Sequence, residues 1–584
     1  MRGNLTPLDL PPPESACGRL PRRGTTLALG ETPSAAFAHG LLRGLQIWRW
    51  ARPARRLGAC LLALAAPLAQ AQALWLDDTG RLRPAAREAV RWLTDAEQQG
   101  LRPQDYDARR LATAVADAER TAPPADAAAQ LDESLTRQVL AYLGDLRGGR
   151  VDPARLGARY DSTTAPAPDL SAALRDAVAR DQPQDAQRAA LPPWLQYPDL
   201  QKALLHHRSL ADHPAWRSAL PALPGGKLQP GQRWAGLPTL AERLHALGDL
   251  PELPGAATTY DAALQKAVQS FQTRHALPAD GVLGKSTLDA LAVPPAARAQ
   301  QIALSMERLR LTPLPQAARF VTVNVPEFML RAHRHEAGSV REDLHMRVIV
   351  GKALDTRTPL FDEDMRWIEF SPYWNIPPSI ARKETVPTLR RNPGYLAAQG
   401  MEFVGAGGVS TAVTPQNLDA VLAGQMRIRQ RPGPRNALGD IKFMLPNNQN
   451  IYLHHTPSPG LFGRTRRDFS HGCVRIEEPV ALAQWVLHDQ PDWTEARIRQ
   501  SMGRPRPVTA KLIQPVPVLM LYQTAVIADG KLHFVPDLYG QDAVLEQALK
   551  QPRPPRDPAV STRSAPALHT RAGAAEAIAA QSGA

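Results

Sequence analysis

Cysteine is nearly absent from this chain of 584 residues, which contains only Cys17, Cys60 and Cys473. The first two fall in an N-terminal segment that has the features of an export signal. An exported chain would then keep one cysteine, which excludes an internal disulfide. A free thiol in an oxidising compartment suggests a chemical task, although a buried and inert cysteine is the alternative.

The chain also lacks a stripe of Lys or Arg interleaved with aromatic residues, although its formal net charge is +13. Residues 1–71 contain nine Arg and three acidic residues, so a large part of the excess lies there. The remaining charge is diffuse, unlike the basic surface of a nucleic-acid-binding domain. We therefore expect no nucleic-acid partner.

No long apolar run marks a membrane span near the N-terminus. The run Leu57–Leu68 covers 12 residues, whereas crossing a bilayer takes about 20. Arg49, Arg52, Arg55 and Arg56 precede it, and Ala69-Gln70-Ala71 follows as an A-x-A cleavage site. This order predicts a cleaved signal peptide and export.

The first long region, from about 75 to 235, is expected to be mostly helical. Apolar residues recur there at spacings of three and four, as in Pro84–Gln99 and Leu135–Leu146. The region contains no catalytic constellation. His206 and His207 are adjacent, so on a helix they point about 100° apart and cannot share a metal ion.

Residues 236–296 are expected to form a compact helical unit. Helices are predicted at Leu237–Leu247 and Tyr260–His275, and a third, capped by Ser286 or Thr287, runs through Leu291. The unit resembles the three-helix peptidoglycan-binding domain type 1, which implies a binding or positioning role. The matching residues are Ala267-Val268, Phe271-Gln272, Leu277, Asp280-Gly281, Gly284, Thr287 and Leu291.

From Arg319 onward the pattern changes to short strands. A hairpin is predicted from Val516–Ile527 and Lys531–Val535, with its turn at Asp529-Gly530. Between Asn375 and Gly439 lies a long Pro-, Gly- and Arg-rich insertion with helical pieces. Insertions of this length are often active-site lids. The other predicted strands are Phe320–Val325, Phe328–Arg334, His345–Val350, Arg366–Phe370, Ile441–Leu445 and Ile451–His455.

The residues that carry chemistry lie between Ile451 and Arg475. On the predicted strand, Tyr452 and His454 face opposite to Ile451 and Leu453. Cys473 follows a glycine in a tight turn, which presents its sulfur beside backbone N–H groups. A thiolate needs a nearby base or cation, and His454 and His471 are candidates. The same three residues could instead form a three-ligand zinc site.

His454, followed after 15 intervening residues by Ser470-His471-Gly472-Cys473, resembles the signature of the YkuD-type L,D-transpeptidases. The resemblance extends over residues 75 to 540 and is closest to the long YcbB-like branch of Gram-negative bacteria. Further matching stretches are Arg308-Leu309-Arg310, Phe370–Ile380, Asn392–Tyr395 and Ala437–Phe443, with Glu97–Tyr106 and Leu135–Pro153 in the helical region.

The resemblance implies roles for individual residues. Cys473 would be the nucleophile and His454 its general base and acid. His471 and Gly472 would shape the turn, with an oxyanion hole of backbone N–H groups around Gly472 and Cys473. Substrate-binding roles fall to Tyr452, Trp374, Ser470 and Arg475. His455 replaces an expected acidic residue, and a backbone carbonyl is expected to orient His454.

The implied reaction is peptidoglycan cross-linking. The Cys473 thiolate attacks a stem tetrapeptide, D-Ala leaves, and the thioester passes to an amine acceptor to give a 3→3 cross-link. No cofactor and no metal are implied. The implied location is the periplasm, in association with the cell wall. Other cell-wall synthases are possible partners, and carbapenem β-lactams are expected to acylate Cys473.

Two other functions remain open at this point. The same residues could serve an L,D-carboxypeptidase or cysteine hydrolase of wall peptides, and a degenerate site would leave a peptidoglycan-binding scaffold.

We expect a multidomain α+β chain with a helical scaffold, a three-helix module and a β-rich catalytic domain with a lid insertion. The expected segments are an N-terminal extension and signal peptide (1–71), a helical scaffold (72–235), a peptidoglycan-binding domain (236–296), a linking helix (297–316), a catalytic domain (317–545, lid 375–439) and a disordered tail (546–584).

Overall fold

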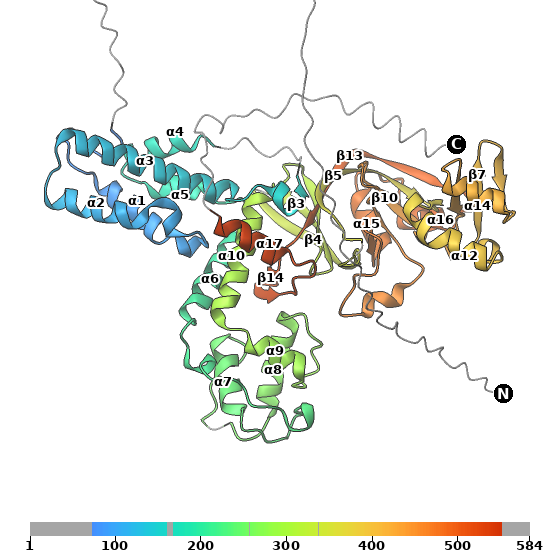
Figure 1. Ribbon diagram of the computed structural model, residues 1–584, viewed down its shortest axis with the longest axis horizontal. Coiled ribbons are helices and arrows are strands. Elements are labelled where there is room, and N and C mark those ends of the chain that lie inside the picture. The colour runs from blue at the N-terminus through green and yellow to red at the C-terminus, as the bar shows by residue number, and fades with distance from the viewer. Residues whose placement is uncertain (1–72, 161–167, 256, 337, 355, 552–584) are drawn as a thin grey trace, which may run out of the picture. The chain divides into compact units, whose positions relative to one another are not determined.

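The computed structural model describes residues 73–160, 168–255, 257–336, 338–354 and 356–551 (Figure 1). The predicted N-terminal extension and signal peptide, and the tail beyond residue 551, lie outside the described residues. The described chain has the expected multidomain α+β fold, with a helical N-terminal region, a small helical module and a β-rich C-terminal domain. Within these residues, no helix combines the length and the apolar character that a membrane span requires.

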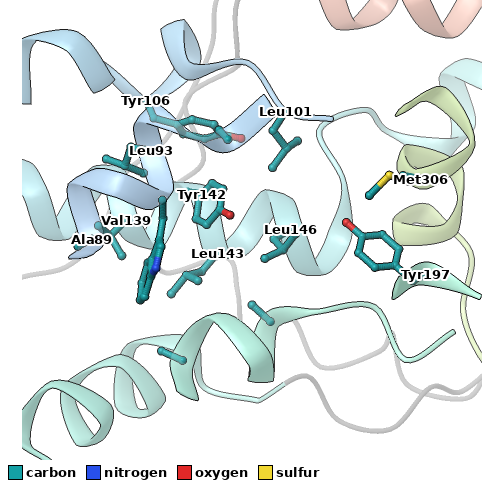
Figure 2. Close-up of a cluster of buried hydrophobic side chains, with 14 of the residues drawn as sticks. Ala89, Leu93, Leu101, Tyr106, Val139, Tyr142, Leu143, Leu146, Tyr197 and Met306 are labelled. Atoms are coloured by element: carbon teal, nitrogen blue, oxygen red, sulfur yellow. The ribbon is translucent and has the colours of Figure 1, made fainter. Parts of the chain in front are cut away.

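The N-terminal region packs its helices around α3, because α3 presents one apolar face. Leu135, Val139, Tyr142, Leu143 and Leu146 recur at helical spacing and are all buried. Figure 2 shows the last four of them among their neighbours. Tyr106 meets Tyr142 edge to face at 5.5 Å and donates a hydrogen bond to Asp145. The helices are α1 (Pro84–Thr94), α2 (Ala108–Arg120), α3 (Ala125–Gly148), α4 (Leu170–Ala179), α5 (Gln184–Ala190) and α6 (Tyr197–Ser209).

The linking helix α10 (Pro295–Leu311) is buried at every residue from Ile302 to Leu311, and it connects this region to the β-rich domain. Arg310 pairs with Glu307 at 2.9 Å and also donates to the Tyr197 hydroxyl of α6. Arg308 pairs with Asp542 near the C-terminus at 2.6 Å. The Arg308-Leu309-Arg310 stretch therefore ties distant segments together rather than contributing to the reaction site.

The helical module consists of α7 (Leu237–Ala246), α8 (Ala262–Arg274) and α9 (Lys285–Ala292) around its own apolar core. The predicted cap of the third helix is wrong. Gly284 occupies the N-cap position and no side chain caps the helix. Thr287 already lies inside the first turn, and its hydroxyl accepts a buried hydrogen bond from Gln272 at 3.2 Å.

The β-rich domain contains a nine-stranded mixed sheet in the order β1-β5-β10-β11-β12-β4-β3-β2-β13, and β13 also pairs with β5, which closes the sheet on itself. Alternate residues such as Val321 and Val323 fill the interior. Helices α15 (Pro479–Val486) and α16 (Glu495–Met502) add side chains to this core. The strands are β1 (Ala158–Arg159), β2 (Arg319–Asn324), β3 (Met329–Glu336), β4 (Ser339–Ile349), β5 (Leu360–Phe370), β10 (Ile441–Met444), β11 (Leu453–His454), β12 (Val474–Ile476) and β13 (Val508–Leu521).

The insertion expected as a lid is a folded subdomain with a sheet in addition to the expected helices. Its four strands pair in the order β6-β9-β7-β8. Leu389, Phe403 and Ile428 are fully buried in a core separate from that of the large sheet. Its elements are β6 (Trp374–Asn375), α11 (Pro378–Ile380), η6 (Ala381–Thr385), α12 (Val386–Arg391), α13 (Tyr395–Ala398), β7 (Met401–Gly405), β8 (Gly408–Ser410), α14 (Pro415–Leu422) and β9 (Met426–Gln430).

The C-terminal segment corrects two expectations. The predicted strand Val516–Ile527 is interrupted, because β13 ends at Leu521 and β14 (Ala525–Ala528) pairs with β15 (Lys531–Phe534) instead. The turn between β14 and β15 lies at Asp529-Gly530 as predicted, and both residues have positive φ.

Residues 546–550, expected to be disordered, belong to helix α17 (Gln541–Lys550). Tertiary contacts stabilise this helix. Leu545 is fully buried against Leu304 and Leu311, and Arg150 donates to the Leu549 carbonyl at 3.0 Å.

Candidate active site

Cys473 lies in a braced turn directly before β12, in the middle of the closed sheet. Gly472 has a φ of +117°, and a Cβ there would lie 3.1 Å from the Ile451 side chain, so only glycine fits without strain. The Ser470 hydroxyl donates to the Cys473 carbonyl at 2.5 Å and accepts from the Gly472 N–H at 3.1 Å. Thr358 donates to the Gly472 carbonyl at 2.8 Å.

Two features of this turn refine the expectations. Ser470 is 2% exposed, so its hydroxyl stabilises the turn from the buried side. The Gly472 N–H already donates to the Ser470 hydroxyl. The Cys473 N–H is therefore the remaining candidate for an oxyanion donor.

The Cys473 thiol is half-buried and donates a weak hydrogen bond to the Asn450 carbonyl at 3.4 Å. Burial raises its pKa, while hydrogen bonds from Tyr452 and the positive charge of Lys442 oppose that rise. The thiol is therefore the resting form at neutral pH, with cationic groups placed to favour a thiolate once the proton leaves.

His454 lies on β11, which pairs with β12 in parallel, and it is 4% exposed. Its Nδ1 donates to the His455 carbonyl at 2.5 Å, so a backbone carbonyl orients the ring as expected. With the proton on Nδ1, Nε2 is the basic nitrogen of the ring. A second backbone hydrogen bond, to Leu438, also acts on the ring and favours its protonated form. Burial, followed by the charge of Arg475, lowers the His454 pKa to about 3. The imidazole is neutral at any ordinary pH.

His455, which takes the place of an expected acidic residue, turns away from this pair. Its Nδ1 bonds Asp440 at 2.8 Å, and only its carbonyl contributes to orienting His454.

Tyr452 connects the thiol to the insertion. Its ring lies 5.7 Å from that of His454, on the side of β11 opposite the buried Ile451 and Leu453, as the alternation predicts. Its hydroxyl contacts Cys473 and accepts a hydrogen bond from Trp374, at the start of the insertion. Burial raises the Tyr452 pKa well above its ordinary range, so the phenol stays protonated.

Lys442 and Glu369 also belong to this group, and the sequence analysis missed both. Lys442 lies opposite His454 in the pairing of β10 with β11 and opposite Glu369 in that with β5. Its Nζ is 4.0 Å from the centre of the Tyr452 ring. Burial raises the Glu369 pKa, and Lys442 lowers it. The sequence signal that could have revealed Lys442 is its place between the core residues Ile441 and Phe443.

His471 and Arg475 lie on two sides of the turn. The exposed His471 bonds Glu384 of the insertion through Nε2 at 2.8 Å. Arg475 lies opposite His454 on the neighbouring strand, and its buried Nε has no hydrogen-bond partner among the described residues. Across the same part of the chain, no group of three His, Cys, Asp or Glu side chains is placed to hold a metal ion.

The matches with known proteins agree with this arrangement. Residues 318–509 match the family described as the YkuD L,D-transpeptidase catalytic domain. Residues 68–204 match one described as a scaffold domain, and residues 235–291 one described as "Putative peptidoglycan binding domain".

A relative from Haemophilus influenzae, named "Putative L,D-transpeptidase", is 32% identical over 252 residues. The match covers 43% of this chain and 49% of the relative, so it spans about half the length of that protein. A solved structure from Clostridium acetobutylicum, titled as a fused Zn-dependent amidase/peptidase/peptidoglycan-binding domain-containing protein, is 10% identical with a TM-score of 0.14. It covers 50% of this chain and 98% of its own, and at that score it bears on neither fold nor function.

The residue signature and the matched regions lead to one assignment. Residues 318–509 form a YkuD-type L,D-transpeptidase catalytic domain, and residues 235–291 form a peptidoglycan-binding domain.

Proposed function

We propose that this protein is a peptidoglycan L,D-transpeptidase that uses Cys473 as its nucleophile. The observation that supports this most is the convergence of three groups on paired strands. A thiol precedes β12, a buried neutral histidine lies on the paired strand β11, and Tyr452 contacts both the thiol and Trp374 at the start of the insertion. These are the groups that acyl transfer through a thioester requires.

In the first step, the proton of Cys473 moves to Nε2 of His454 as sulfur attacks the carbonyl of the third residue of a stem tetrapeptide. The tetrahedral oxyanion is stabilised by the Cys473 N–H. The C–N bond to D-Ala then breaks, and the amine leaves with the proton from His454. A thioester on Cys473 remains.

The pKa values explain why attack and proton transfer belong together. The Cys473 pKa is raised and the His454 pKa is about 3 in the unliganded site. A separated thiolate–imidazolium pair is therefore unfavourable before substrate binds. Lys442 and Arg475 favour negative charge on sulfur and oppose positive charge on His454. The proton must leave His454 quickly, and D-Ala release provides that route.

In the second step, an amine from a neighbouring stem attacks the thioester and loses its proton to His454. The Cys473 sulfur leaves as the C–S bond breaks and takes that proton from His454, which restores the thiol and the neutral imidazole. The product is a 3→3 cross-link. Water in place of the amine would yield a tripeptide, as in a carboxypeptidase. Glu384 of the insertion contacts His471 beside the nucleophile, so the insertion is positioned to restrict water at this step.

The proposed partners and location follow from this reaction. Peptidoglycan supplies both the donor peptide and the acceptor amine, and the helical module holds the chain on it in the periplasm, in association with the cell wall. Carbapenems would acylate Cys473 because they present a strained carbonyl to the same thiol. Other cell-wall synthases are proposed as functional neighbours.

The test is mass spectrometry of the purified protein incubated with disaccharide tetrapeptide. We expect an acyl adduct on Cys473 and a cross-linked muropeptide dimer, and we expect Cys473→Ala to lose both while its thermal unfolding stays unchanged. Dimer formation by Cys473→Ala would refute the proposed nucleophile. Tripeptide without dimer would identify a hydrolase, and the absence of any adduct or product would identify a non-catalytic scaffold.

A further inference from the structure

Lys442 is a charged residue that the closed sheet withdraws from water. It lies on β10 between Ile441 and Phe443, which are both fully buried in the core. Its own side chain points to the other face of the strand, because side chains alternate along a strand. Burial lowers the Lys442 pKa. A buried ammonium is costly unless neighbouring groups compensate for it, so its neighbours indicate what it does.

Strand register places Lys442 in a row of polar residues. It lies opposite Glu369 of β5 on one side and opposite His454 of β11 on the other. Tyr452 shares this face because it comes two residues before His454, and their rings lie 5.7 Å apart. The pairing of three strands therefore delivers an ammonium to the group that surrounds Cys473.

The Lys442 ammonium lies over the ring of Tyr452. The distance from Nζ to the ring centre is 4.0 Å, which is inside the range of about 6 Å over which a cation is attracted to an aromatic face. Both strands are hydrogen-bonded to each other, so neither group can move away without breaking the register. This contact fixes the plane of the phenol and the direction of its hydroxyl.

The Tyr452 hydroxyl is placed between Trp374 and Cys473. It forms hydrogen bonds with both side chains. The indole N–H of Trp374 can only donate, so the phenol oxygen is the acceptor in that bond and its hydrogen is left for the sulfur. The bond from Tyr452 favours the anionic form of Cys473. Tyr452 therefore donates to the atom on which negative charge develops.

A purely structural pair with Glu369 is the alternative role for Lys442. Each of the two lowers the cost of charging the other, since Glu369 raises the Lys442 pKa and Lys442 lowers the Glu369 pKa. A structural pair, however, would need neither the ring contact nor an influence on sulfur. Lys442 and Cys473 also favour each other's charged forms. Glu369 thus anchors the ammonium, and Tyr452 and Cys473 receive its effect.

We propose that Lys442 is a positioning residue that holds the Tyr452 phenol against Cys473, so that the Tyr452 hydroxyl stabilises the developing thiolate. The inference rests on the proposed role of Cys473 as the nucleophile. As the proton moves from sulfur to His454, a donor already aimed at sulfur stabilises the new charge without having to reorganise. Trp374 completes the arrangement, because it occupies the acceptor side of the phenol.

The test is the pH dependence of Cys473 alkylation by iodoacetamide in the full chain, followed by mass spectrometry of the peptide that contains Cys473. The thiolate is the reactive form, so the rate reports on sulfur and needs no turnover. We expect Lys442→Met to move the profile to higher pH and to slow alkylation at neutral pH by about three- to tenfold. Lys442→Arg keeps a cation over the ring and should restore most of the wild-type rate.

Controls separate positioning from packing. Lys511→Met on β13, where the lysine is exposed, should leave the profile unchanged. Lys442→Gln is a second neutral variant should Lys442→Met fold poorly, and thermal unfolding checks each protein. Equal slowing in Lys442→Arg and Lys442→Met would assign the effect to packing and overturn the proposal. A profile that neither neutral variant changes would also overturn it, and would leave the proposed transpeptidase reaction standing.

A double-mutant cycle separates action through Tyr452 from a direct effect of charge on sulfur. Tyr452→Phe removes the hydroxyl and keeps the ring beneath Lys442. In that background, Lys442→Met should change the alkylation rate by less than about twofold, because the group that Lys442 positions is gone. An effect of Lys442→Met as large as in the wild-type background would show that Lys442 acts directly on sulfur and would overturn the positioning role.

Discussion

The sheet around Cys473 and the insertion at residues 375–439 are stabilised in different ways. The sheet holds its titratable groups by burial and strand register, as with His454 between Lys442 and Arg475. The insertion has its own apolar core and its own sheet. The insertion makes a polar contact with the turn that carries Cys473 through the Glu384–His471 pair. In the proposed reaction we therefore expect the acylation step to depend on the sheet and the choice of acceptor to depend on the insertion.

The largest effect should come from the base in the sheet. Replacing His454 by Gln removes the proton acceptor but keeps a group that can donate to the His455 carbonyl. We expect the rate of acylation to fall by about 10²–10⁴, measured by rapid-quench mass spectrometry of the adduct. His455→Gln, which alters only the neighbour that faces Asp440, is the matched control and should retain most activity. Unchanged acylation in His454→Gln would remove His454 from the mechanism.

Acid should destabilise the sheet through the same residue. The folded-state pKa of His454 is about 3, below the ordinary value of 6.5, so the unfolded chain binds a proton that the folded chain does not. The contribution of neutral His454 to the free energy of unfolding is present above pH 6.5 and is lost as pH falls toward 3.

The measurement is the free energy of unfolding against pH in wild type and in His454→Gln. The variant should lose up to about 5 kcal/mol of this pH dependence. His207 and His333, each with a pKa near 4, should account for part of the remaining acid sensitivity. A profile unaffected by His454→Gln would contradict the buried neutral imidazole.

A smaller effect is expected at the turn that holds the nucleophile. Gly472→Ala introduces a Cβ at a positive φ and within 3.1 Å of Ile451, and it should cost about 1–3 kcal/mol in unfolding free energy. Acylation should fall further than this loss suggests, because the turn sets the position of sulfur. Gly460→Ala, where an added Cβ meets no atom within 4 Å, should be nearly neutral in a chemical denaturation series.

The smallest effect on stability should come from the contact between the two regions. Glu384→Gln breaks a largely exposed pair and should change the unfolding free energy by less than about 0.5 kcal/mol. It should nevertheless raise the ratio of tripeptide to dimer, read by chromatography of the products. Glu402→Gln, which breaks a buried pair with Arg429 inside the insertion, should destabilise that subdomain more. If Glu384→Gln leaves the ratio of tripeptide to dimer unchanged, this contact of the insertion does not control the choice of acceptor.

Much of the site was predictable because its parts are close in the chain. Gly472, Cys473 and the alternation of Tyr452 and His454 are local features, and strand periodicity places the two side chains on one face whatever the rest of the fold does. Lys442 and Glu369 were missed because they join the site through cross-strand register, which local patterning does not specify.

The sequence by itself determined the domain types, the nucleophile candidate and the histidine that accompanies it, because each is encoded in short-range spacing. The tertiary structure decided the rest. It made helix α17 from residues expected to be disordered, because Leu545 finds a buried partner surface. It buried Ser470 so that its hydroxyl bonds within the turn, and it left the amide of Gln523 buried without a hydrogen-bond partner. Burial and the proximity of distant segments govern these features, and both arise only when the chain has folded.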